Sequence, residues 1–85
     1  MNKETQSVLK HLKNKAYISP LNQQIVLPTI RQTNDALELN LEQIEEAYQD
    51  LLELGQIEQY SEYQFIPGLQ FALPQKIKDK LRLGY

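Results

Sequence analysis

Residues 40–55 read NLEQIEEAYQDLLELG and show the strongest helical pattern in this 85-residue chain. At about 100° per residue, apolar side chains fall on one arc of such a helix, and acidic and amide side chains fall on the opposite arc. Asn40 is suited to cap the helix, Gln43 stands at the return position of a capping box, and Gly55 can adopt the left-handed conformation that ends a helix. Burial of the apolar arc is expected to supply most of the folding free energy. Its members are Leu41, Ile44, Ala47, Tyr48, Leu51, Leu52 and Leu54.

Two shorter helices are expected before this one. Apolar residues recur at three- and four-residue spacing between Lys3 and Lys15, which predicts a first amphipathic helix. Pro20 then breaks the helical pattern, and residues 25–27 allow a short strand. Thr29 with a glutamine three residues later has the form of a capping box, so a second helix should begin there. The side chains expected to be buried on it are Ile30, Ala36 and Leu37.

After Gly55 the pattern changes from helical to alternating, which predicts a β-hairpin around a polar turn at residues 61–62. Pro67 and Gly68 suit the two central positions of a type II turn. Residues 69–73 either return as a third strand or pack across the hairpin, and the sequence does not separate the two arrangements. A last short helix is expected over residues 75–83, ended by the following glycine.

Composition excludes several classes of protein. One small domain, residues 1–85, is all that this length allows. Cysteine is absent and there is one histidine, so neither a disulfide framework nor a metal site is expected. No apolar stretch is long enough for a membrane span, which favours a cytoplasmic protein. No serine has a nearby partner for nucleophilic chemistry, and the carboxylates fall on an exposed helix face, so we expect neither an enzyme nor a cofactor.

Charge is distributed unevenly along the chain. The net charge is −2, but residues 32–75 contain nine acidic side chains and no Lys or Arg. The basic residues lie in the first 31 and the last ten positions. Any partner of the middle segment therefore meets a negative field.

Residues 27–57, LPTIRQTNDALELNLEQIEEAYQDLLELGQI, resemble without a gap the DNA-binding domain of GntR-type bacterial transcription regulators. That family's pattern begins Leu-Pro-Ser-x-Arg and ends Leu-x-x-x-Gly-x-Ile. The resemblance implies a mainly α fold with a small β-hairpin, a winged helix-turn-helix. It would have a three-helix core, a helix-turn-helix part at 27–57, a wing at about 56–73 and a short C-terminal helix at about 75–83. The family's effector domain would be missing.

The resemblance also transfers DNA-contacting positions. The motif arginine corresponds to Arg31, and the serine that caps the recognition helix corresponds to Asn40. Other positions depart from the family: its arginines correspond to Leu41 and Glu45, and its turn glycine to Glu38. The residues that the resemblance leaves as candidates to contact bases or phosphates are Thr29, Arg31, Asn40 and Gln43.

Two functions follow as expectations. The first is a small DNA-binding transcription regulator, in which lysines of the first and last helices (Lys10, Lys13, Lys15, Lys76 and Lys80) and Arg82 would assist. The second is a winged-helix adaptor or antagonist that binds a basic protein and no DNA. A homodimer is compatible with either function, and no small-molecule substrate is inferred. The face expected to bind a protein contains Glu42, Glu45, Glu46, Asp50, Glu53, Tyr60 and Tyr63, although the two tyrosines are expected more often to pack across the hairpin strands.

Overall fold

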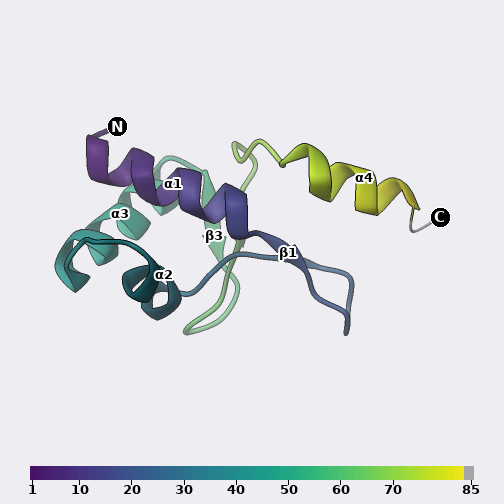
Figure 1. Ribbon diagram of the computed structural model, residues 1–85, viewed down its shortest axis with the longest axis horizontal. Coiled ribbons are helices and arrows are strands. Elements are labelled where there is room, and N and C mark those ends of the chain that lie inside the picture. The colour runs from purple at the N-terminus through teal and green to yellow at the C-terminus, as the bar shows by residue number, and fades with distance from the viewer. Residues whose placement is uncertain (84–85) are drawn as a thin grey trace.

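The computed structural model describes residues 1–83 and contains four helices and two small antiparallel hairpins (Figure 1). The expected helix end at residue 84 lies outside these residues. None of the described helices has the length and apolar character needed to cross a bilayer. In chain order the elements are α1 (Lys3–Lys15), β1 (Tyr17–Ile18), β2 (Ile25–Val26), α2 (Ile30–Ala36), α3 (Leu41–Glu53), β3 (Ile57–Gln59), β4 (Phe65–Pro67) and α4 (Gln75–Leu83).

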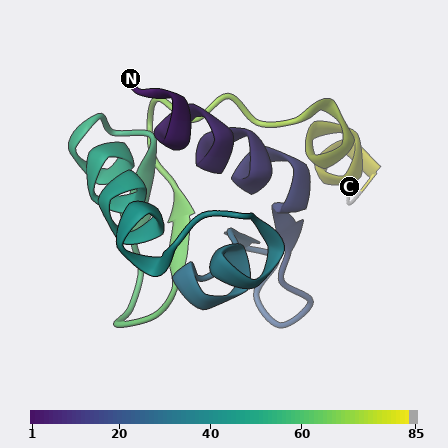
Figure 2. The ribbon, with the colours of Figure 1, turned by 60° about the vertical axis from the view of Figure 1, so that its left-hand side comes forward.

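Helix α3 packs against α1 and α2, and its apolar arc forms the centre of the core (Figure 2). Its middle positions are buried as expected, but Leu41 and Leu54 are each 50% exposed. Both lie at the ends of the helix, so the buried stretch of α3 is shorter than the periodicity predicted. The buried α3 side chains are Ile44, Ala47, Tyr48 and Leu51, and they join Val8 and Leu12 of α1.

Helix α2 begins as predicted, but it buries a different residue. The Thr29 hydroxyl accepts the Gln32 N–H at 3.1 Å, and the Gln32 side-chain oxygen accepts the Thr29 N–H at 2.9 Å. Ala36 is exposed, contrary to expectation, whereas Ile30 and Leu37 are half-buried. The fully buried residue is Thr33, whose hydroxyl lies 2.7 Å from that of Tyr48. A polar side chain is buried here because it has a hydrogen-bonding partner on α3.

The chain between α1 and α2 forms a hairpin of which only the second strand was predicted. Tyr17 pairs with Val26, and Ile18 pairs with Ile25. Beyond this hairpin, the Leu27 N–H donates to the Phe65 carbonyl at 3.0 Å, as an isolated antiparallel bridge. This bridge ties the segment before α2 to the second hairpin.

Strands β3 and β4 form the predicted hairpin, with Glu58 opposite Ile66. The chain after it does not form a third strand: Phe71 is buried in the core, and Leu69 is exposed. The expected type II turn at residues 67–68 is wrong, because Gly68 does not have the positive φ that such a turn requires. The turn lies two residues later, with residues 69 and 70 at its centre, where the Phe71 N–H donates to the Gly68 carbonyl at 3.1 Å.

Gly68 is required for space. A Cβ at this position would lie 2.3 Å from the Gly55 carbonyl oxygen, and the Gly68 N–H donates to the Gln56 carbonyl at 2.9 Å. Gly55 has the φ of +74° that was expected at the end of α3. The two glycines therefore bring the end of α3 and the end of the hairpin together.

Helix α4 projects from the body beyond the C-terminal end of α1 (Figure 1). Ile77 of α4 is fully buried, and the Lys76 ammonium donates to the Asn14 carbonyl in the last turn of α1. This projection accounts for the elongated shape of the molecule, which measures 40 by 22 by 22 Å.

Candidate functional site

The solvent side of α3 carries several exposed carboxylates. We call it the acidic face and define it by Glu42, Glu45, Glu46 and Glu53, all of which are exposed. Asp50, which was expected in the same set, is half-buried and accepts a hydrogen bond from the Thr5 hydroxyl of α1 at 3.1 Å. Asp50 therefore helps to join α3 to α1, and the other four carboxylates remain directed to solvent.

Three of the four expected DNA-contacting residues are occupied by helix capping. Asn40 accepts the Gln43 N–H at 2.8 Å, and the Gln43 side-chain oxygen accepts the Asn40 N–H at 3.1 Å. Thr29 caps α2 in the same way. The capping bonds engage the side-chain oxygens of these residues and do not use the amide nitrogens of Asn40 and Gln43. Thr29, Asn40 and Gln43 therefore have capping roles, and their contact with DNA stays a prediction.

Arg31 differs from these three residues. It lies in the first turn of α2, and its side chain is exposed. Within the described residues it makes no hydrogen bond to Asp35, the acidic residue one turn later on the same helix. A single guanidinium thus remains available for a phosphate or a carboxylate on this side of the molecule.

The tip of the β3–β4 hairpin presents aromatic and acidic side chains. Tyr60 and Tyr63 are 55% and 71% exposed, so the expected packing of these rings across the strands is not observed. The tip is held by the Tyr60 N–H, which donates to the Gln64 carbonyl at 2.8 Å. Glu58 and Glu62 are exposed on the same hairpin. This surface is suited to apolar contact combined with negative charge.

The exposed lysines of the described residues lie on α1 and α4, and one of them, Lys3, is at the start of α1, which lies beside α3. Lys10 and Lys15 of α1 and three lysines of α4 are exposed, and the Lys76 contact with α1 brings the two helices together. Lys13 is half-buried, with its ammonium 5.8 Å from the centre of the Phe71 ring. The Arg82 side chain, expected to belong to the same set, lies outside the described part of the structure. In both ribbon views α3 and α4 are at opposite sides of the molecule (Figures 1 and 2).

Tyr48 is buried as expected, but the sequence did not reveal which residues it contacts. Its hydroxyl donates to the Pro28 carbonyl at 2.6 Å and lies 2.7 Å from the Thr33 hydroxyl. Its ring meets the Phe65 ring edge-on, with 4.8 Å between the two ring centroids. Burial raises the pKa of Tyr48 to about 12, and the hydrogen bond with Thr33 opposes that shift. One side chain thus orients the start of α2, α3 and the hairpin relative to one another.

Within residues 1–83, no group of three or more His, Asp or Glu side chains is arranged to hold a metal ion. A scan against protein-family models, a search of curated proteins and a search of solved structures each found no match to this chain. Function must therefore be argued from the surfaces described above.

Proposed function

We propose that this chain is a winged-helix protein that binds a basic protein partner through the acidic face of α3 and the tip of the β3–β4 hairpin. The single observation that supports this most is the charge of α3. The helix in the recognition position presents four exposed carboxylates and no cation.

Three features support the winged-helix assignment. The order of helix, short strand, two capped helices and hairpin is the one that the sequence resemblance implied. The bridge between Leu27 and Phe65 adds a third short segment beside the hairpin, as a wing sheet needs. Four residues separate α2 from α3, a spacing typical of a helix-turn-helix.

Electrostatics favours a protein over DNA at this face. Specific DNA binding takes much of its free energy from Lys and Arg placed against phosphates. Charges on a recognition helix approach the DNA backbone more closely than the screening length of about 8 Å at physiological salt. Glu42, Glu45 and Glu46 would thus repel a duplex at contact distance. The same carboxylates, with exposed Leu41 beside them, would attract a partner whose surface combines Lys or Arg with apolar side chains.

Fluorescence polarisation with a labelled Lys- and Arg-rich peptide tests the proposal. The wild-type chain should bind the peptide with an affinity that falls as salt increases, because the contacts are ionic. Glu45→Lys should weaken binding by about tenfold or more, since it replaces an attraction with a repulsion.

Asp79→Lys is the matched control, because it makes the same change in net charge on α4, at the far side of the molecule. It should change peptide affinity by less than about twofold. Equal losses from the two variants would mean that net charge alone drives binding, and the proposed face would be rejected.

DNA binding is the second candidate function, and the position of the basic side chains favours it. Arg31 and the exposed lysines of α1 and α4 lie outside the acidic face and could contact phosphates without it. In that arrangement Arg31→Ala and Lys80→Gln should each weaken binding to mixed duplex DNA, and Glu45→Lys should strengthen it. Absence of DNA binding even at low salt would remove this candidate.

A further inference from the structure

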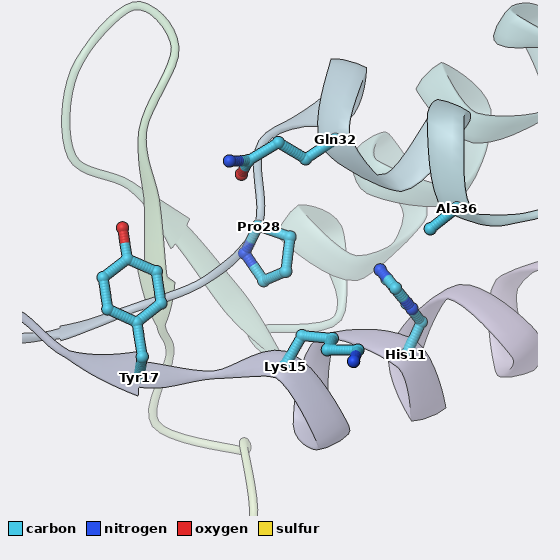
Figure 3. Close-up of a pocket in the computed structure, with 6 residues that line it drawn as sticks. All are labelled: His11, Lys15, Tyr17, Pro28, Gln32 and Ala36. Carbon is cyan, nitrogen blue, oxygen red and sulfur yellow. The ribbon is translucent and has the colours of Figure 1, made fainter.

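A hollow of about 270 Å³ lies between the C-terminal half of α1 and the start of α2, away from the acidic face. Figure 3 shows Pro28 in its centre, with Gln32 of α2 on one side and Lys15 of α1 on the other. Tyr17 and His11 stand at its two ends, and Ala36 lies beside His11. The hollow is smaller than the roughly 300 to 1,000 Å³ usual for sites that bind drug-sized molecules, so it suits a small ligand.

The walls of this hollow combine flat apolar surfaces with hydrogen-bond donors. Tyr17 supplies a half-exposed aromatic ring, and Pro28, which is buried, forms the floor. No acidic side chain lines the hollow. Its polar groups are the Lys15 ammonium, the His11 imidazole and the Gln32 amide.

The Gln32 amide is held in one orientation. Its oxygen accepts the Thr29 N–H at 2.9 Å as part of the capping box, which leaves the amide nitrogen to donate. Lys15 can only donate, whereas a neutral His11 both donates and accepts. The one charged group of the hollow is thus the Lys15 ammonium, and the complementary ligand is an acceptor with negative charge.

We propose that this hollow binds a small aromatic carboxylate, with its ring between Tyr17 and Pro28 and its carboxylate between Lys15 and Gln32. The ring would stack on Tyr17 above the Pro28 floor, and the carboxylate would receive a charge-assisted hydrogen bond from the lysine. This inference goes beyond the proposed function and does not depend on it, because it uses neither α3 nor the β3–β4 hairpin.

The state of His11 agrees with such a site. Partial burial, together with the nearby Lys15 ammonium, lowers the pKa of His11 below its usual value of 6.5. Lys15 is the one other charged group that lines the hollow. A bound carboxylate would oppose the effect of Lys15 and raise the pKa of His11.

The test uses proton NMR of the His11 imidazole, which is a clean reporter because the chain has a single histidine. Benzoate is the probe. We expect a saturable shift of the imidazole signals and a higher His11 pKa in its presence. Lys15→Gln should weaken benzoate binding by about tenfold. Lys10→Gln, at an exposed position of the same helix outside the hollow, should leave it unchanged.

Two control ligands separate the ring from the charge. Acetate has the carboxylate without the ring, benzamide has the ring without the charge, and both should bind more weakly than benzoate at equal ionic strength. If acetate or benzamide bound as tightly as benzoate, or if Lys15→Gln left benzoate binding intact, the assignment would be overturned. A shift of His11 that rises without saturating would overturn it as well.

Discussion

Tyr48→Phe tests how the start of α2, α3 and the hairpin are held together. The substitution removes only the hydroxyl, which donates to the Pro28 carbonyl at 2.6 Å and lies 2.7 Å from the Thr33 hydroxyl. The ring that meets Phe65 edge-on is retained. Any loss of stability therefore reports the two hydrogen bonds and leaves the apolar packing nearly unchanged.

The expected loss follows from what the hydroxyl leaves behind. A typical hydrogen bond contributes about 1 kcal/mol, and a buried group left without a partner costs about 1 to 3 kcal/mol. The Pro28 carbonyl would lose its Tyr48 donor in a buried position, whereas the Thr33 hydroxyl can turn toward the backbone of its own helix. We therefore expect Tyr48→Phe to lower the free energy of unfolding by about 2 to 4 kcal/mol. In a chain of this length that corresponds to a fall in Tm of about 10 to 25 °C.

Urea unfolding followed by circular dichroism measures this loss, and the m-value should not change, because the surface exposed on unfolding is the same. Thr33→Val is the matched control, since it removes one hydroxyl and leaves the Tyr48 bond to Pro28 in place. It should cost about 1 kcal/mol, and the double variant should cost less than the sum of the two. A loss below about 0.5 kcal/mol for Tyr48→Phe would show that water replaces the hydroxyl, and the reasoning would fail.

Three further outcomes are expected. The pKa of Tyr48 is raised to about 12 in the folded chain, so the stability gained from burying the neutral hydroxyl is complete below pH 10. That stability should be lost as pH rises toward 12, by up to about 2 to 3 kcal/mol. Urea midpoints from pH 9 to 12 should therefore fall more for wild type than for Tyr48→Phe. Gly68→Ala should destabilise the chain by more than about 1 kcal/mol in the same urea assay, because its Cβ would lie 2.3 Å from the Gly55 carbonyl oxygen, and a neutral result would show that the turn can move away. Asn40→Ala removes the N-cap of α3 and should cost about 1 kcal/mol by thermal unfolding, whereas an unchanged Tm would mean that this cap contributes nothing.

The helices were predictable from sequence because each of the first three carries a local signal. Asn40 with Gln43 and Thr29 with Gln32 are capping boxes, and the structure contains both. Gly55 ends α3 with the left-handed φ that its position required. Signals of this kind depend on neighbouring residues alone, so they can be recognised without knowledge of the rest of the fold.

Long-range features were not predictable in the same way. The burial of Thr33 depends on Tyr48, fifteen residues away, and a helical pattern based on hydrophobicity places Ala36 in the core instead. The role of Gly68 depends on its distance from Gly55, which no local turn rule contains. Strand β1 has two residues, too few to show an alternating pattern.

The candidate site was predictable in part. Exposure of Glu42, Glu45 and Glu46 follows from the helical arc, and the structure confirms it. The hydrogen bond from Thr5 to Asp50 and the exposure of Tyr60 are tertiary features that the pattern did not contain. The hollow beside α1 combines side chains from three separate segments, so it could be found only in the folded chain.

The most direct test of the proposed function is an NMR titration of the labelled chain with mixed duplex DNA and, separately, with a Lys- and Arg-rich peptide, both at low salt. The account predicts that the peptide produces saturable shifts in the amides of α3 and of the β3–β4 hairpin tip, and that DNA leaves these amides unchanged. Saturable DNA-induced shifts across Arg31, Gln43 and Glu45 would contradict it, because they would place a duplex against the acidic face.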